Sequence, residues 1–355
     1  MNAAFWKDRS VLITGHTGFK GSWLALWLQN LGANVTGYAL PAPTTPSLFE
    51  QARVADCMTS VIGDIRDLAT FSDAMTRAQP EVVFHLAAQS LVRLSYDEPV
   101  ETYQTNVMGT VNVLEACRRV DSVAAVVIVT TDKCYENREW LWPYRENDSL
   151  GGRDPYSNSK ACAELVTESY RQSFLASKHI GVASVRAGNV IGGGDWARDR
   201  IVPDAMRAFA GGSPLVIRNP ASIRPWQHVL EPLAGYITLA EKLFGDRKGF
   251  AEPWNFGPAD DLVLPVGDLA DRLVDAWGNG AAWHTVEQAA APHEARLLRL
   301  DASKARDRLG WKPSLSIGAA CTWIVGWHKG VANGADARAL TESQTTNYAA
   351  MLESS

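Results

Sequence analysis

Short runs of β-branched and other apolar residues alternate with helix-forming segments through the first half of the chain, and this alternation constrains the fold most. The expected strands are residues 10–15, 34–40, 58–65, 81–88, 124–131 and 181–188. Their nearly continuous apolar character is typical of parallel strands, because crossover helices cover both faces of such a sheet. The sequence therefore predicts an α/β protein with a doubly wound, Rossmann-type parallel sheet.

After about residue 188 the alternation gives way to loops rich in Gly, Arg and Trp. We expect residues 1–188, together with about 229–257, to form the dinucleotide-binding domain. Residues of about 189–228 and 258–330 are expected to form a smaller α/β substrate-binding lobe. Residues 331–355 are polar with weak helical spacing, so we expect a loosely packed C-terminal tail.

Composition limits the classes of partner. With 46% hydrophobic residues among 355, the chain can bury a sizeable core, and its net charge of -5 favours neither nucleic acid nor an anionic membrane. No apolar stretch reaches the roughly 20 residues of a membrane helix, and the N-terminus lacks the pattern of a signal peptide. The five Cys fall at no metal-ligand spacing. We expect a cytoplasmic protein with reduced thiols and no metal site.

A glycine-rich loop follows the first expected strand. The segment ITGHTGFKGSW places Gly15, Gly18 and Gly21 between a strand and the helix expected at 20–33, and Phe19 in the same loop is also an expected cofactor contact. Glycines there permit a tight turn and close approach of a pyrophosphate, and the helix N-terminus favours negative charge. The alternative is a tight turn without a ligand. The strand–turn–helix context favours the dinucleotide site.

The second strand lacks the acidic residue that usually binds the adenosine ribose, and Tyr38 stands where that acid is expected. His16 and Lys20 lie within the glycine loop instead. They are either phosphate ligands or solvated loop residues. NAD is the expected cofactor, and NADP is not excluded.

Further cofactor contacts are expected at the ends of later strands. In GDIRD, Asp64 is placed to meet the adenine, although a strand-end turn explains it equally. HLAAQS ends a strand in small residues that allow backbone approach. Asn106 is either a cofactor contact or a buried amide bonded to nearby backbone. The cofactor contacts expected on these segments and at the end of the fifth strand are Asp64, Ile65, Leu86, Ala87, Ala88, Asn106 and Thr130.

Tyr156 and Lys160, in DPYSNSKACAE, are spaced i and i+4 and therefore lie on one side of a helix. A phenol normally has a pKa near 10, and a nearby ammonium favours the phenolate, which can accept a proton from a sugar hydroxyl. Lys160 would also hold a ribose. A Tyr and a Lys at this spacing are in many proteins only a pair on the surface of a helix. The glycine loop and the apolar strand that precede them here favour a catalytic role.

These motifs together resemble the extended short-chain dehydrogenase/reductases. Within that family the chain looks like the nucleotide-sugar 4,6-dehydratases, to about Pro313. The dTDP-glucose dehydratases read Thr-Asp-Glu where this chain has Thr131, Asp132 and Lys133. That Lys, with CYENREWLWPYREND, RAGNVIGGGDWARDR and RPWQHVLEPLAGY, is similar to the CDP-glucose 4,6-dehydratases.

The resemblance implies a reaction that needs a second acid–base pair. Oxidation at C4 of the sugar acidifies the C5 proton, a base removes that proton, and an acid protonates the leaving C6 hydroxyl. We assign Asp132 as the acid and Lys133 as the base, with Thr131 bonding the C4 oxygen. The plainer alternative is a helix-capping Asp beside a solvated Lys.

The resemblance also places the substrate, CDP-glucose. Arginine binds diphosphate oxyanions bidentately, and Arg224 and Asn189 match the diphosphate-binding positions of the family. Arg200 and Arg299 are weaker candidates for the diphosphate, and His293 and Glu294 fall where the substrate lobe of the family approaches the nucleoside. For each of these arginines, the alternative to ligand binding is an ordinary ion pair on the protein surface. Trp196 and Trp226 either cover the sugar or base, or simply pack.

Two other functions are open from the sequence. A nucleotide-sugar 4-epimerase would use Tyr156 and NAD but would need no elimination pair. A non-catalytic nucleotide-binding protein of the same fold would not need an intact set of Thr131, Tyr156 and Lys160. The family resemblance also implies a homodimer or homotetramer, assembled through helices expected at residues 100–120 and 155–178.

Overall fold

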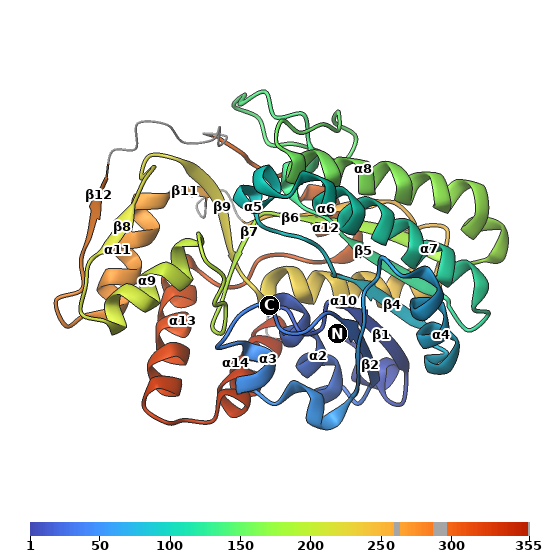
Figure 1. Ribbon diagram of the computed structural model, residues 1–355, viewed down its shortest axis with the longest axis horizontal. Coiled ribbons are helices and arrows are strands. Elements are labelled where there is room, and N and C mark those ends of the chain that lie inside the picture. Colours follow the sequence, from blue (N-terminus) through green and yellow to red (C-terminus); the bar gives the residue numbers. More distant parts are fainter. Residues whose placement is uncertain (259–262, 287–296, 354–355) are drawn as a thin grey trace.

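Seven parallel strands form the central sheet of the computed structural model, which describes residues 1–258, 263–286 and 297–353 (Figure 1). Their order is β10-β6-β5-β4-β1-β2-β3. The strands are β1 (Ser10–Thr14), β2 (Asn34–Ala39), β3 (Thr59–Ile62), β4 (Val82–His85), β5 (Ala125–Val129), β6 (Gly181–Ala187) and β10 (Pro253–Phe256). This confirms the doubly wound fold. The strand order reverses between β1 and β4, where ligands bind in such folds.

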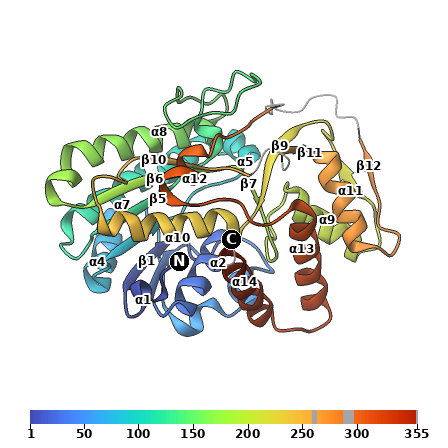
Figure 2. The same cartoon turned by 180° about the vertical axis from the view of Figure 1, so that it is seen from behind.

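Helices cover both faces of this sheet, as Figures 1 and 2 show from opposite sides. On one face α2 (Phe19–Asn30) and α10 (Leu230–Gly245) pack on alternate residues of the strands. On the other face lie α4 (Leu68–Ala78), α7 (Gly109–Arg119) and α8 (Pro155–Tyr170). Strands that meet helices on both faces must be apolar at every position, which explains why β5 is buried throughout.

The remaining described helices are short or lie outside the sheet layers. They are α1 (Ala3–Trp6), α3 (Leu48–Gln51), α5 (Val92–Asp97), α6 (Pro99–Tyr103), α9 (Ile201–Ala210), α11 (Val266–Trp277), α12 (Ser303–Leu309), α13 (Ile317–Ala332) and α14 (Ala337–Glu353). A π-helical segment, Gln104–Met108, joins α6 to α7, and further turns extend α8 to Lys178. No helix in the described ranges is long and apolar enough to cross a membrane.

Two small sheets lie apart from the central one. β7 (Asn189–Ile191), β9 (Ile223–His228) and β11 (Val263–Pro265) form one, and β8 (Leu215–Ile217) with β12 (Trp283–Thr285) forms the other. Together with α9, α11 and α13 they enclose a separate apolar core. The domain boundaries expected from the sequence remain a prediction, and the position of β10 in the large sheet is consistent with them.

The C-terminal segment is not loosely packed, and that expectation is wrong. α14 packs on α2, and Tyr348 is fully buried with its ring edge-on to Trp27. The Tyr348 hydroxyl donates to Glu231 Oε2 at 2.6 Å. The buried face of α14 consists of Ala337, Thr341, Thr345 and Tyr348. Because most of these side chains are small or polar, hydropathy does not reveal the helical stripe.

Candidate active site

The loops after β1 and β4 meet where the strand order reverses. Gly15 has φ +77°, and a Cβ on it would lie 2.7 Å from the backbone N of Ala87. A Cβ on Gly21 would lie 2.1 Å from the Gly15 carbonyl oxygen. Only glycine fits either position. Gly18 caps α2 without a capping side chain, so the helix N-terminus is presented at this turn, the geometry of a phosphate-binding loop.

His16 does not fit the role of a phosphate ligand. Its ring is fully buried over Gly37, and its Nε2 lies 2.7 Å from Ser60 Oγ. Burial lowers the pKa of His16 to about 4, so the imidazole is neutral near physiological pH and offers no charge to a phosphate.

Lys20 points towards the residues that are predicted to be catalytic. Its ammonium lies 5.9 Å from the centre of the Tyr236 ring. Burial, with the nearby charges of Arg200 and Lys160, lowers the pKa of Lys20 to about 7. The residue is therefore neither a solvated loop lysine nor directed to the adenosine end of the site.

Tyr38 does not lie where the sequence suggested, in place of the acid that binds the adenosine ribose. This side chain is fully buried in the core between the sheet and α4, edge-on to Phe71 at 5.0 Å. It therefore cannot stand where a ribose-binding acid would, and that interpretation is wrong. Side chains alternate between the two faces of a strand, so an error of one residue reverses the direction.

Asp64 follows β3 and is already engaged by a neighbour. Its carboxylate accepts hydrogen bonds from the Arg66 backbone N and side chain, both at 2.8 Å, and these bonds hold the pKa of Asp64 below its usual value. Ile65 is buried, and its carbonyl accepts from Asn112 Nδ2 at 2.9 Å. Asn112 thus fixes this turn, a role that the sequence did not suggest.

Asn106 is a buried amide that holds the loop after β4. Its Oδ1 accepts from Gln89 N, and its Nδ2 donates to the Gln89 carbonyl and to Ser159 Oγ, each at 2.9 Å. This is the structural alternative that the sequence left open. Asn106 ties the segment containing Leu86, Ala87 and Ala88 to α8.

Tyr156 and Lys160 lie on α8 beside the end of β5, as the spacing requires. Both are buried, and the Lys160 ammonium donates to the Val129 carbonyl at 3.1 Å. Burial raises the pKa of Tyr156 to about 12, whereas a hydrogen bond with Thr131 and the charge of Arg200 lower it. Burial also lowers the pKa of Lys160 to about 8, an effect that Glu164 opposes.

Asp132 and Lys133 form a short turn directly after Thr131. Asp132 is fully buried; its Oδ1 accepts from Thr131 Oγ1 at 2.9 Å and lies 3.9 Å from Lys133 Nζ. Among the described residues, Oδ2 of Asp132 has no hydrogen-bond partner. Thr131, not Asp132, caps the turn by accepting from the Lys133 backbone N. The alternative of a capping Asp is therefore wrong.

Thr131 places the two acid–base sets in contact. Its hydroxyl donates to Asp132 Oδ1 at 2.9 Å, its side chain lowers the pKa of Tyr156, and Thr131 and Tyr156 are both less than one-tenth exposed. A phenol, a carboxyl group and an ammonium group thus lie together at one edge of the sheet. Such an arrangement suits oxidation followed by elimination.

The residues predicted for the diphosphate lie on two different segments. Asn189 pairs with Trp226 in the sheet of β7 and β9, and Arg224 is two residues from that pair. Among the described residues, the buried Oδ1 of Asn189 has no hydrogen-bond partner. Arg224 is buried and donates to the Ile223 carbonyl at 2.9 Å.

Arg200 lies nearer the reacting groups than the sequence suggested. It donates to Asp195 and to Ser90 Oγ, each at 3.0 Å, and its charge acts on Tyr156. Arg299 is partly buried, and its Nε is without a hydrogen bond in the described part of the chain. His293 and Glu294 lie outside the described residues.

The two tryptophans considered for the substrate are packing residues. Trp226 is buried in the core of the small lobe and donates to the Leu264 carbonyl at 3.1 Å. Trp196 donates to Gln51 Oε1 at 2.9 Å and packs edge-on to His328.

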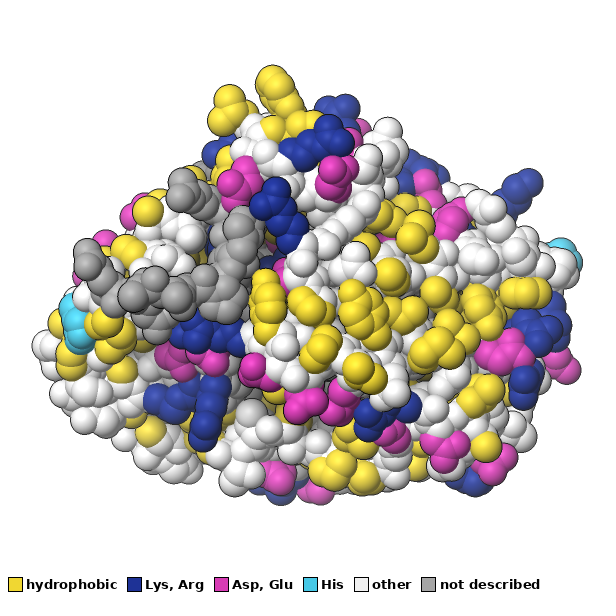
Figure 3. Space-filling view, turned by 45° about the horizontal axis from the view of Figure 1, so that its top comes forward, with side chains coloured by type: hydrophobic (Ala, Val, Ile, Leu, Met, Phe, Trp, Pro, Cys, Tyr) yellow, Lys and Arg dark blue, Asp and Glu magenta, His cyan; other side chains and the backbone are white. Residues whose placement is uncertain are grey.

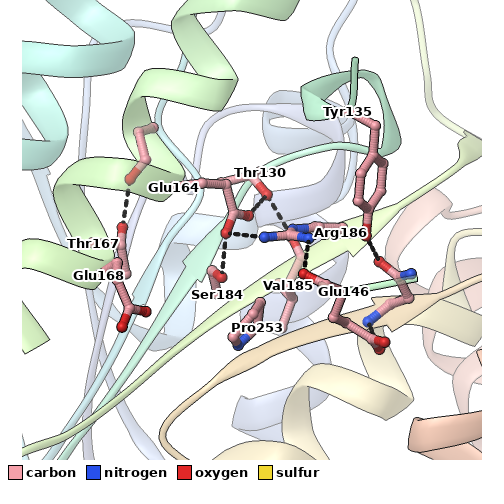
Figure 4. A network of polar contacts seen from close by, with 12 residues as sticks. Thr130, Tyr135, Glu146, Glu164, Thr167, Glu168, Ser184, Val185, Arg186 and Pro253 are labelled. Atoms are coloured by element: carbon pink, nitrogen blue, oxygen red, sulfur yellow. Dashed lines mark hydrogen bonds and ion pairs between the residues drawn. The ribbon is translucent and has the colours of Figure 1, made fainter. Parts of the chain in front are cut away.

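Tyr236 and a buried ion pair near the site escaped the sequence reasoning. Tyr236 on α10 is fully buried, and burial, followed by the charges of Asp132 and Tyr156, raises its pKa. Glu164 on α8 pairs with Arg186 on β6 at 2.8 Å (Figure 4). No local pattern marks either feature. Their buried positions in the structure are the signal that identifies them.

Comparison with known proteins agrees with this geometry. The family model for GDP-mannose 4,6 dehydratase matches residues 12–322. The chain is 53% identical over 349 residues to CDP-glucose 4,6-dehydratase of Salmonella typhimurium, covering 97% of each chain. It is 30% identical over 332 residues to dTDP-glucose 4,6-dehydratase of Streptomyces antibioticus, covering 90% of this chain and 92% of the relative.

Solved structures share the fold. The dTDP-glucose 4,6-dehydratase DesIV of Streptomyces venezuelae, with NAD and TYD bound, gives a TM-score of 0.77 at 24% identity, covering 92% of this chain and 98% of that one. UDP-glucose 4-epimerase of Thermotoga maritima, with UDP-glucose, gives 0.78 at 21% identity, covering 91% and 99%. At these identities the likeness establishes the fold alone.

Proposed function

The chain belongs to the GDP-mannose 4,6 dehydratase family of extended short-chain dehydrogenase/reductases, and we propose that it converts CDP-D-glucose to CDP-4-keto-6-deoxy-D-glucose. The observation that supports dehydration most directly is the Asp132–Lys133 turn beside Tyr156. Oxidation at C4 alone would need only Tyr156 and Lys160. The extra acid and base are what loss of water across C5 and C6 requires.

The glycine loop supports NAD as the cofactor. Gly15 and Gly21 pack too closely against neighbouring backbone for a side chain, and the tight turn they form presents the N-terminus of α2, which favours a pyrophosphate. Asp64 and Ile65 would border the adenosine end, and Lys160 would hold the nicotinamide ribose. A bound NAD would supply the acceptor for the hydride from C4 and the donor of the hydride to C6.

Tyr156 is the proposed base for the C4 hydroxyl. The positive charge of Arg200 acts on its phenol and stabilises the phenolate against the opposing effect of burial. The Thr131 hydroxyl donates its proton to Asp132 Oδ1. Thr131 is also proposed to bond the C4 oxygen, which orients that carbon towards the cofactor.

Lys133 and Asp132 are the proposed base and acid of elimination. Lys133 takes the proton from C5 while Asp132 protonates the C6 hydroxyl, which leaves as water. Lys133 then gives a proton back to C5 when hydride reaches C6. The burial of Asp132 would keep bulk water from the leaving group, and the 3.9 Å between its Oδ1 and Lys133 Nζ would let the two groups act on adjacent carbons.

Arg224 and Asn189 are the proposed diphosphate ligands, with Arg200 and Arg299 near the sugar and nucleotide. Arg224 contributes a buried guanidinium, and Asn189 contributes a buried amide oxygen with no hydrogen-bond partner in the described ranges. Preference for cytosine is proposed from the identity of 53% to a CDP-glucose enzyme over nearly the whole length.

The test is incubation with CDP-glucose, dTDP-glucose and GDP-mannose, each with and without added NAD. The expected result is a 4-keto-6-deoxy product from CDP-glucose, identified by NMR. Turnover of only a non-cytidine sugar would overturn the substrate assignment. Formation of only a C4 epimer would show that the protein is an epimerase.

Helices α5 to α8 are the proposed subunit interface of a homodimer. Figure 3 shows a band of hydrophobic side chains across this part of the surface. The exposed apolar residues on these helices and the segments that extend them are Leu94, Tyr96, Val100, Tyr103, Met108, Leu165 and Phe174. Such an extent of exposed apolar side chains on adjacent helices is typical of an interaction surface.

Light scattering after size-exclusion chromatography tests the dimer. Met108→Arg combined with Leu165→Arg should give monomers, because two charges would be buried at the contact. Leu141→Arg is the matched control, since Leu141 is 75% exposed in a loop outside these helices. A wild-type monomer, or a double variant that still dimerises, would contradict this surface.

A further inference from the structure

A network of buried polar side chains, which Figure 4 shows from close by, joins Thr130 and Tyr135, the residues that flank the Thr131–Asp132–Lys133 turn. Its centre is Glu164, one helical turn after Lys160. One carboxylate oxygen accepts from Thr130 Oγ1; the other accepts from Ser184 Oγ at 2.6 Å and from Arg186 Nη2 at 2.8 Å. Although burial acts in the opposite direction, Arg186 holds the pKa of Glu164 below its usual value.

Arg186 continues the network to the far side of the turn. Its Nη1 donates to Tyr135 Oη at 2.9 Å and to the Glu146 carbonyl at 3.0 Å. Tyr135 Oη donates to Asn255 Oδ1 at 2.7 Å. The Tyr135 ring also lies below the guanidinium, 4.9 Å from it. Tyr135 is 1% exposed, so water cannot replace these bonds.

The turn that carries Asp132 and Lys133 is therefore held at both ends by one ion pair. Thr130 precedes the turn and bonds Glu164, whereas Tyr135 follows it and bonds Arg186. Tyr156 and Lys160 have a separate support, because they lie on α8 and Lys160 bonds the Val129 carbonyl. Loss of the Tyr135 hydroxyl should loosen the turn without moving α8.

We infer that Tyr135 is a positioning residue, anchored by the Arg186–Glu164 pair, which holds Asp132 and Lys133 for elimination at C5 and C6 but is not needed for oxidation at C4. A buried ion pair adds little stability by itself, since desolvation offsets its attraction. Fixing one arrangement of a catalytic turn is a role that such a pair can fill.

The test is Tyr135→Phe, which removes one oxygen atom and keeps the ring. Tyr348→Phe is the matched control. Tyr348 is also fully buried, and its hydroxyl donates to the buried Glu231, but it lies on α14, outside the network. Reduction of NAD in a single turnover, followed by its near-ultraviolet absorbance, should stay within about twofold of wild type in Tyr135→Phe. Steady-state formation of the 4-keto-6-deoxy product should fall roughly tenfold to a hundredfold, so that reduced cofactor accumulates.

Glu164→Gln should affect the two reaction steps differently from Tyr135→Phe. It weakens the anchor of both the turn and α8, so oxidation and elimination should fall together. Tyr348→Phe should change neither step. If Tyr135→Phe slows both steps equally, or leaves elimination unchanged, the inference is wrong.

This inference rests on the proposed function, so one measurement is made without substrate or cofactor. Amide hydrogen exchange of residues 131–135 should be faster in Tyr135→Phe than in wild type, whereas exchange in α8 should be unchanged. Unchanged exchange at the turn would overturn the anchoring role. Failure of wild type to dehydrate CDP-glucose would instead count against the proposed function.

Discussion

Asp132→Asn should stop elimination while leaving oxidation at C4 intact. The substitution conserves size and retains the oxygen that accepts the Thr131 hydroxyl at 2.9 Å, so the turn should keep its geometry. What it removes is the proton that the leaving C6 hydroxyl needs. Hydride transfer precedes that step, so the variant bound to CDP-glucose should accumulate reduced cofactor. Lys133→Met should do the same by removing the C5 base.

The exposure of the two side chains sets the size of each effect. General acid or base catalysis contributes roughly 10²–10⁴-fold, which is about 3–5 kcal/mol of activation free energy. Asp132 is fully buried, so water cannot replace it, and its loss should lie near the upper end. The Lys133 side chain is 31% exposed. Its loss should lie near the lower end and should be partly restored by small primary amines in solution.

Rapid mixing with CDP-glucose, followed through the absorbance of reduced nicotinamide, measures the first step, and NMR of the product measures the second. Asp148→Asn is the matched control, because Asp148 lies in the following loop and outside the proposed site. A variant of Asp132 or Lys133 that binds the sugar normally but reduces no NAD would refute the division of roles. Rescue of Asp132→Asn by external acids would refute the argument from burial.

Three further changes test the electrostatics and the packing. In wild type the pKa of Lys160 is lowered by burial from 10.5 to about 8, so a buried ammonium destabilises the fold below about pH 8, and this cost disappears as the pH rises towards 10.5. Lys160→Met removes this cost but also loses the hydrogen bond to Val129, so it should raise the free energy of unfolding by roughly 2 kcal/mol near pH 7. Above pH 10 the increase should be much smaller, and urea denaturation measures both values. Tyr38→Glu should lower it by several kcal/mol, seen as a large fall in the thermal midpoint, because it places a charge in the core beside Phe71. Truncation before Ala337 should also destabilise the protein by several kcal/mol in the same assay, because it exposes the surface that Tyr348 covers; an unchanged midpoint would contradict its packing.

The sheet and the glycine loop were predictable because each rests on local chemistry. Buried parallel strands require unbroken apolar runs, and the close approach of Gly15 to Ala87 requires glycine. The pairing of Tyr156 with Lys160 on one helix also follows from spacing alone. These features therefore appear in the sequence before any fold is known.

Features that depend on direction or burial were not predictable. Tyr38 points into the core between the sheet and α4, and a strand pattern without a register does not show this direction. His16 is close to the predicted loop in sequence, but its burial makes it neutral. The buried face of α14 is made of small and polar residues that resemble a solvated tail.

The network behind the catalytic turn shows why a motif defines chemistry more readily than geometry. Asp132 and Lys133 are adjacent in the chain, so their proximity is given by the backbone. Their orientation depends instead on Glu164 and Arg186, which come from a helix and a strand and contact the residues before and after the turn. Sequence reasoning finds the proposed acid and base because they are adjacent in the chain. The groups that align them are separated by dozens of residues, and only the folded structure brings them together.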